Sequence, residues 1–169
     1  MTMWRRVAAR REEVRRLVDE LGCVTASELA RRLGLSHTQA VYTLKMLEGI
    51  VSYKIGRIRV WCASPVPPDA LYATIHPCFR YVEEALREIL EGARGSIVTL
   101  TPGALLKAAA RLYRRDCAAA SPHLLAAARR WLETRLDGAI LTWSRNEWRD
   151  MKYIIDVKKA REKLAVGYV

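Results

Sequence analysis

Two consecutive capping boxes constrain this fold more than any other feature of the chain. Thr25 and Glu28 form the first box, and Gly34 is placed to end that helix in the left-handed conformation. Ser36 and Gln39 form the second box directly after that turn. Each box satisfies backbone N–H groups that a helix leaves unpaired at its start, and so it fixes where a helix begins. The sequence therefore predicts two short helices joined by a tight turn.

A short hairpin follows the second helix, which Gly49 closes. Apolar and polar residues alternate over 51–55 and again over 58–62, as they do in half-buried strands. Gly56 and Arg57 supply the turn between these strands. Helix, turn, helix and hairpin are thus expected in that order.

This order over residues 25–62 resembles the winged-helix superfamily, in particular the form found in small prokaryotic transcription regulators. A helix predicted over 4–21 would be the first helix of such a module. The resemblance implies that helix 36–48 enters the major groove of duplex DNA. It also implies that wing 54–59 contacts the backbone or minor groove, and that the protein regulates transcription.

The second half of the chain repeats this order with weaker sequence character. Pro at the first helical position opens two of its helices, as it commonly does. The predicted helices cover 78–91, 101–116 and 121–136, and the predicted strands cover 96–98, 139–143 and 152–157. Asp156 is placed to cap a last short helix.

We therefore expect a mainly α fold with small β-wings, of the α+β class, built as two tandem winged-helix domains. The N-terminal domain covers 1–63 and the second winged-helix-like domain covers 78–169. Residues 64–77 form a proline-rich linker between them, because prolines discourage both helix and central strand.

Positive charge is concentrated at both ends of the chain. The formal net charge is +11, with 12 basic and 6 acidic side chains in residues 1–64 and 14 basic and 7 acidic in 101–169. Residues 65–100 carry 3 basic and 5 acidic side chains. Two basic lobes favour a polyanionic partner, while solubility and surface ion pairs are the other explanation. Arg outnumbers Lys 22 to 7, which fits either a thermophilic source or GC-rich codons.

The resemblance places one set of DNA contacts on the second helix and the wing. These candidates are Ser36, His37, Thr38, Gln39, Tyr42, Lys45, Lys54, Arg57 and Arg59. Gln39 or His37 can read a base edge, and the cations can reach phosphates. Val41 is expected on the same outward side, and an exposed Val41–Tyr42 pair also suits a protein partner.

A second basic surface is expected in the C-terminal half. Its candidate nucleic-acid contacts are Arg129, Arg130, Arg145, Trp148 and Arg149. Arg135 lies on the same predicted helix. Trp148 can stack on a base or anchor a protein interface, and both remain open. Trp131 and Trp143 are expected in the core.

The four cysteines show no CxxC spacing, so no zinc site is expected. They are either small buried thiols, which the preference of cysteine for interiors favours, or disulfides. The pairs in question are Cys23 with Cys62 and Cys78 with Cys117.

No enzyme motif is present: the chain has no phosphate-binding glycine loop, GxSxG or HExxH. We expect no catalysis, cofactor, metal or small-molecule substrate. No apolar run approaches the length that spans a bilayer, so a cytoplasmic, nucleoid-associated protein is expected. Its partners would be duplex DNA and a second copy or another protein. The alternative is a tandem winged-helix scaffold in a transcription, replication or chromosome complex, with only weak non-specific DNA contact.

Overall fold

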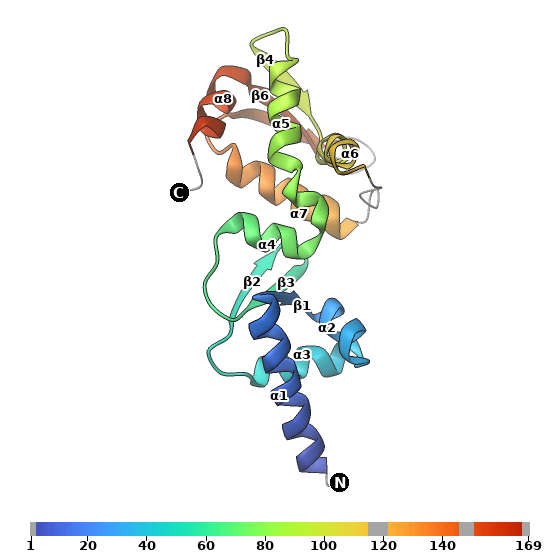
Figure 1. Ribbon diagram of the computed structural model, residues 1–169. Helices are drawn as coiled ribbons and strands as arrows, with labels where there is room; N and C mark the ends of the chain where they lie inside the picture. The colour runs from blue at the N-terminus through green and yellow to red at the C-terminus, as the bar shows by residue number, and fades with distance from the viewer. Residues whose placement is uncertain (1–2, 115–121, 146–150, 167–169) are drawn as a thin grey trace. The chain divides into compact units, whose positions relative to one another are not determined.

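The computed structural model describes residues 3–114, 122–145 and 151–166 (Figure 1). The chain divides into two compact units, Met1–Ile75 and His76–Val169. No helix of the described residues is long and apolar enough to cross a membrane.

The first unit contains the two capped helices and the hairpin that the sequence predicts. Its sheet is antiparallel with strand order β1-β3-β2, so the strand that precedes the capped helices pairs with the second strand of the hairpin. The elements are α1 (Met3–Leu21), β1 (Cys23–Thr25), α2 (Ala26–Leu33), α3 (His37–Met46), β2 (Val51–Ile55), β3 (Ile58–Cys62) and α4 (Pro68–Ile75).

The core of this unit lies between its helices and one face of the sheet. Val14 and Val18 are the buried residues of α1. They belong to a cluster with Leu29 of α2, Leu44 of α3 and Trp61 of β3. Each element thus contributes its apolar side to one core, as the periodicity predicts.

The segment predicted as a linker contains a helix, α4. Pro68 occupies its first position, where the missing N–H of proline leaves no hydrogen bond unmade. Leu71 and Tyr72 are buried, and α4 packs against β1 and β3. The prolines therefore start a helix here instead of preventing one, and α4 belongs to the first unit.

The second unit repeats the plan of the first. Its antiparallel sheet has strand order β4-β6-β5, the same relation of first, third and second strand as in the first unit. The expected helix 78–91 is divided into a short 3-10 turn and an α-helix. The elements are η1 (Pro77–Arg80), α5 (Val82–Glu91), β4 (Ile97–Leu100), α6 (Pro102–Tyr113), α7 (Pro122–Arg135), β5 (Ile140–Arg145), β6 (Met151–Asp156) and α8 (Val157–Ala165).

Both units are thus mainly helical with a small antiparallel sheet, and the predicted α+β class is confirmed. Thr101 caps α6 through the Ala104 N–H, and Asp156 caps α8 through the Lys159 N–H, the latter as predicted. These caps explain why the boundaries could be anticipated from sequence.

Arg135 is buried and joins three parts of the second unit. Its guanidinium donates from Nε to Glu83 Oε1 of α5 at 2.7 Å, and from Nη1 and Nη2 to the carbonyls of Lys163 and Val166 at 2.8 and 3.1 Å. A buried charge is tolerated when it is paired and hydrogen-bonded in this way. Arg135 therefore does not belong to the basic surface on which the sequence placed it.

Cys23 and Cys62 form a disulfide between β1 and β3. The two residues face each other in the strand register, and their Cα atoms lie 4.1 Å apart. Cys78 is disulfide-bonded as well, whereas Cys117 lies outside the described residues. The expectation of free buried thiols is wrong for these three described cysteines.

Removing the first disulfide should destabilise the first unit. The bond closes a loop with a sequence separation of 39 residues, and chain entropy predicts a loss of about 3–4 kcal/mol. The double variant Cys23→Ala/Cys62→Ala tests this by urea unfolding, since alanine adds no unsatisfied hydroxyl at the buried Cys62 site. Equal stability of the variant and the oxidised wild type would contradict this role of the bond.

His76 begins the second unit as a helix cap. Its Nδ1 accepts a hydrogen bond from the Cys78 N–H at 3.1 Å, and burial lowers its pKa below the usual 6.5. The neutral imidazole is therefore the form that fits the fold, because protonation removes the acceptor.

Stability should consequently fall on mild acidification. A lowered folded pKa means that the contribution of His76 is complete above pH 6.5 and is lost as the pH falls through the folded value. His76→Asn keeps a capping side chain that does not titrate. Unfolding free energies measured between about pH 8 and pH 5 should fall more steeply for wild type than for this variant. Parallel curves would exclude this role of His76.

Candidate nucleic-acid interface

Helix α3 presents a continuous exposed stripe opposite its buried side. Thr38, Tyr42 and Lys45 recur at helical spacing and are all exposed, with Tyr42 at 63%. Ala40 and Leu44 are buried. An exposed hydroxyl, phenol and ammonium along one helix face can contact phosphates and base edges together.

The capping box at the start of α3 changes what two of the candidates can do. Ser36 Oγ accepts from the Gln39 N–H at 3.1 Å, and Gln39 Oε1 accepts from the Ser36 N–H at 3.0 Å. A bidentate contact with adenine needs both ends of the glutamine amide. With the cap formed, Gln39 is engaged in the fold, and His37 is the exposed base-reading candidate that remains.

Val41 does not lie on the outward stripe. It is half-buried and packs against the core of the first unit. Thr43, which the sequence analysis left unassigned, is buried and donates from its hydroxyl to the Gln39 carbonyl at 2.8 Å. The expected exposed Val–Tyr pair is therefore reduced to Tyr42 alone.

The β2–β3 wing adds exposed cations to the same unit. Lys54 and Arg57 are exposed, and the turn between the strands places Gly56 at a φ of 61°, a conformation that favours glycine. Arg59 is partly committed to the fold: its Nη1 donates to Ser52 Oγ at 3.0 Å, and its guanidinium lies 5.8 Å from the Trp61 ring centroid. Lys54 and Arg57 are thus the wing cations best able to reach a phosphate.

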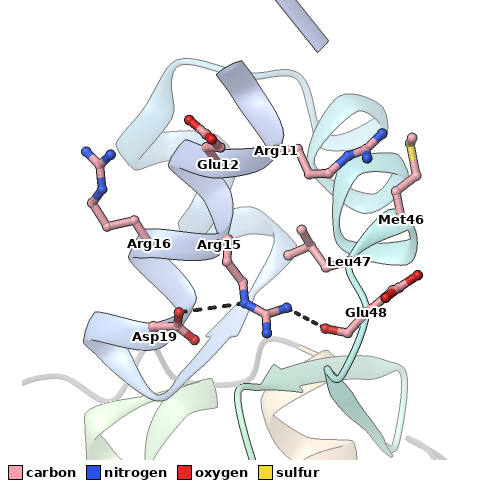
Figure 2. Close-up of a pocket in the computed structure, with 8 residues that line it drawn as sticks. All are labelled: Arg11, Glu12, Arg15, Arg16, Asp19, Met46, Leu47 and Glu48. Carbon is pink, nitrogen blue, oxygen red and sulfur yellow. Dashed lines mark hydrogen bonds and ion pairs between the residues drawn. The ribbon is translucent and has the colours of Figure 1, made fainter. Parts of the chain in front are cut away.

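A hollow of about 750 Å³ lies between α1 and the end of α3 (Figure 2). Arg15 spans it, donating from Nη1 to the Glu48 carbonyl and pairing through Nε with Asp19 at 3.6 Å. Arg11 lines the same hollow. This arginine-bearing wall of α1 was not among the residues that the sequence analysis selected, because a winged-helix resemblance directs attention to α3.

The corresponding helix of the second unit, α7, carries a partly neutralised face. Arg129 donates from Nε to Glu133 Oε1 at 3.1 Å, and the Tyr153 hydroxyl donates to the same oxygen at 2.6 Å. Desolvation, followed by the hydrogen bond with Glu133, raises the pKa of Tyr153. The hydrogen bond with Glu133 likewise raises the pKa of Arg129. Arg129 is therefore held in an ion pair.

The remaining candidates of this unit are divided. Arg130 and Arg145 are exposed, while Trp148 and Arg149 lie outside the described residues. Trp131 is buried as expected, but the expectation for Trp143 is wrong, since it is 60% exposed. Trp143 lies on β5, whose outer edge pairs with no further strand among the described residues.

No group of three or more potential metal ligands gathers among the described residues. The two units thus differ in surface: the first combines a polar helix stripe with exposed wing cations, and the second combines a partly neutralised helix with an exposed tryptophan.

No protein-family model matches the sequence, and no curated protein is significantly similar to it. The crystal structure of the hypothetical protein PyrSV_gp04 from Pyrobaculum spherical virus is similar, with a TM-score of 0.59 and 19% sequence identity. The similarity covers 92% of this chain and 97% of that chain. Neither unit alone spans so much of the chain, so the shared fold includes residues of both units.

Proposed function

We propose that this chain is a DNA-binding protein made of two tandem winged-helix domains, and that the first domain contacts duplex DNA through α3 and the β2–β3 wing. One observation carries the proposal. The exposed stripe Thr38, Tyr42 and Lys45 lies on the second helix of a helix-turn-helix, and the same unit exposes Lys54 and Arg57 on its hairpin.

Phosphate neutralisation would supply most of the affinity. Lys45, Lys54 and Arg57 form no ion pair within the described part of the chain, so their charge is available to a polyanion. His37 and Tyr42 are the side chains that would read base edges or the thymine methyl group. The biological role that fits best is transcription regulation at the nucleoid, although a shared fold by itself does not select a function.

The three interface cations should set the salt dependence of DNA binding. Each lost phosphate contact removes about 0.9 from the slope of log affinity against log salt. Lys45→Gln/Lys54→Gln/Arg57→Gln should therefore lower the slope by about 2–3. The slope is measured by fluorescence anisotropy with a random-sequence duplex, at salt concentrations between about 50 and 200 mM.

A matched control removes the same charge elsewhere. Arg94→Gln/Lys158→Gln/Lys159→Gln replaces three exposed cations of the second unit that lie outside the proposed contacts. For this variant, the slope of log affinity against log salt should equal that of wild type, apart from a small effect of the lower net charge. If the salt slope falls equally in both variants, the charge acts without a defined interface. If the wild type does not bind DNA at low salt, the proposal is refuted.

A scaffold that binds proteins is the second candidate, and the exposed aromatic on β5 favours it. Trp143 is 60% exposed beside Leu141 at 53%, and tryptophan is enriched at the centres of protein interfaces. The edge of β5 also leaves backbone groups for a further strand. Under this alternative, α3 contributes little to DNA affinity.

Two exposed aromatics distinguish the candidates without requiring a known partner. Tyr42 and Trp143 are 63% and 60% exposed, so Tyr42→Ser and Trp143→Ser are equivalent surface changes. The proposed function predicts that Tyr42→Ser lowers duplex affinity several-fold and that Trp143→Ser leaves it unchanged. If both variants bind DNA as wild type does, the α3 interface is wrong and the scaffold is favoured.

A further inference from the structure

The first half of α1 extends beyond the core of its unit. None of the residues from Met3 to Glu13 is buried, whereas Val14 and Val18 in the second half are. Met3 is 77% and Trp4 80% exposed. Figure 1 shows this part of the helix continuing past the other elements of the first unit. The helix is therefore longer than the packing of its own unit requires.

This extension is rich in arginine. It carries Arg5, Arg6, Arg10 and Arg11, and the first acidic residue of the helix is Glu12. No ion pair within the described part of the chain engages Arg6, Arg10 or Arg11. We call residues Met3–Arg11 the arginine arm.

The charges of the arginine arm oppose the helix that carries them. Arg5 and Arg6 lie in the first turn, which has no acidic residue, and positive charge there is disfavoured by the helix dipole. Arg6 and Arg10 are a like-charge pair four residues apart, which also destabilises a helix. A bound anion would reverse both effects, so the arm is suited to a negatively charged partner.

We propose that the arginine arm binds the phosphate backbone of duplex DNA, as a contact separate from α3 and the wing. The inference rests on the proposed function, which places the same unit on DNA. Arg11 lines the hollow whose other wall includes Met46, so the arm begins beside the end of α3. The nine residues of the arm span roughly 13 Å of helix. Phosphate contacts along the arm lengthen the interface beyond α3.

Two other occupants fit this surface less well. A second arm would bring two sets of arginines of like charge together. A helix that lies on a membrane separates its apolar and basic faces. Here Arg10 and Arg11 follow Val7 by three and four residues, and so they interrupt the stripe that leads from Val7 to Val14.

The test compares three charge-matched variants of the full chain on one random-sequence duplex. Arg6→Gln/Arg10→Gln/Arg11→Gln removes the arm cations, and glutamine preserves helix propensity. Its salt slope should fall by about 2–3 relative to wild type, while the Arg94/Lys158/Lys159 control should not change. Circular dichroism should show a helix content no lower than that of wild type, since the arm charges disfavour the helix. An arm variant that behaves like the control would overturn the inference.

The α3–wing variant separates this inference from the proposed function. A lower salt slope in the α3–wing variant alone supports the proposed function and refutes DNA binding by the arginine arm. A lower salt slope in the arm variant alone supports DNA binding by the arginine arm and refutes the α3 interface. As a second measurement, duplex DNA should protect Trp4 from acrylamide quenching, with Trp4→Phe as the background. The last measurement uses vesicles of equal parts phosphatidylserine and phosphatidylcholine. If the arm variant loses binding to these vesicles but binds DNA as wild type does, the partner of the arm is a membrane surface and the inference is overturned.

Discussion

The pairing of β1 with β3 holds the proposed interface together. β1 is only three residues long, yet it lies between α1 and α2 in the chain and pairs with the second strand of the wing. The Cys23–Cys62 disulfide closes this pair. This contact joins the end of α1 and the start of α2 to the wing, and a three-residue strand alone would hold it weakly. The core cluster that includes Val18, Leu44 and Trp61 packs the helices against β3 as well. The equivalent β4–β6 pairing in the second unit has no such bond among its described residues, and there the buried Arg135 network joins α5, α7 and the end of α8.

Sequence alone predicted what local chemistry determines. Ser36 and Thr25 fixed the starts of α3 and α2, and the order of elements in both units followed from caps, turns and alternation. What it missed depends on tertiary contacts. Arg135 looked like surface charge, because its partners lie on distant parts of the chain. Trp143 looked like core, because the apolar segment 139–143 does not reveal that β5 is exposed from Leu141 to Arg145. Pro68 looked like a linker residue, although proline is common at the first position of a helix.

The two units use one architecture with different electrostatics. On α3, the exposed Lys45 has no acidic partner among the described residues. On α7, Glu133 pairs with the Arg129 guanidinium and accepts a hydrogen bond from the Tyr153 hydroxyl. A cation already paired with a carboxylate offers a phosphate less net positive charge than an unpaired cation does. The proposal therefore places DNA on the first unit because of this difference in pairing, more than because of any difference in fold.

Net charge is therefore a poor guide to where a polyanion binds. Some of the excess of +11 is committed inside the protein, as in Arg135, or balanced at the surface, as in Arg31 and Arg32 around Glu28, whose pKa they lower. The arginine arm differs because its positive charges work against the helix that carries them. A folded chain keeps such local conflict most readily where a partner relieves it. For this reason Arg6, Arg10 and Arg11 of α1, which form no ion pair within the described part of the chain, are a more direct sign of an anionic ligand than the net charge is.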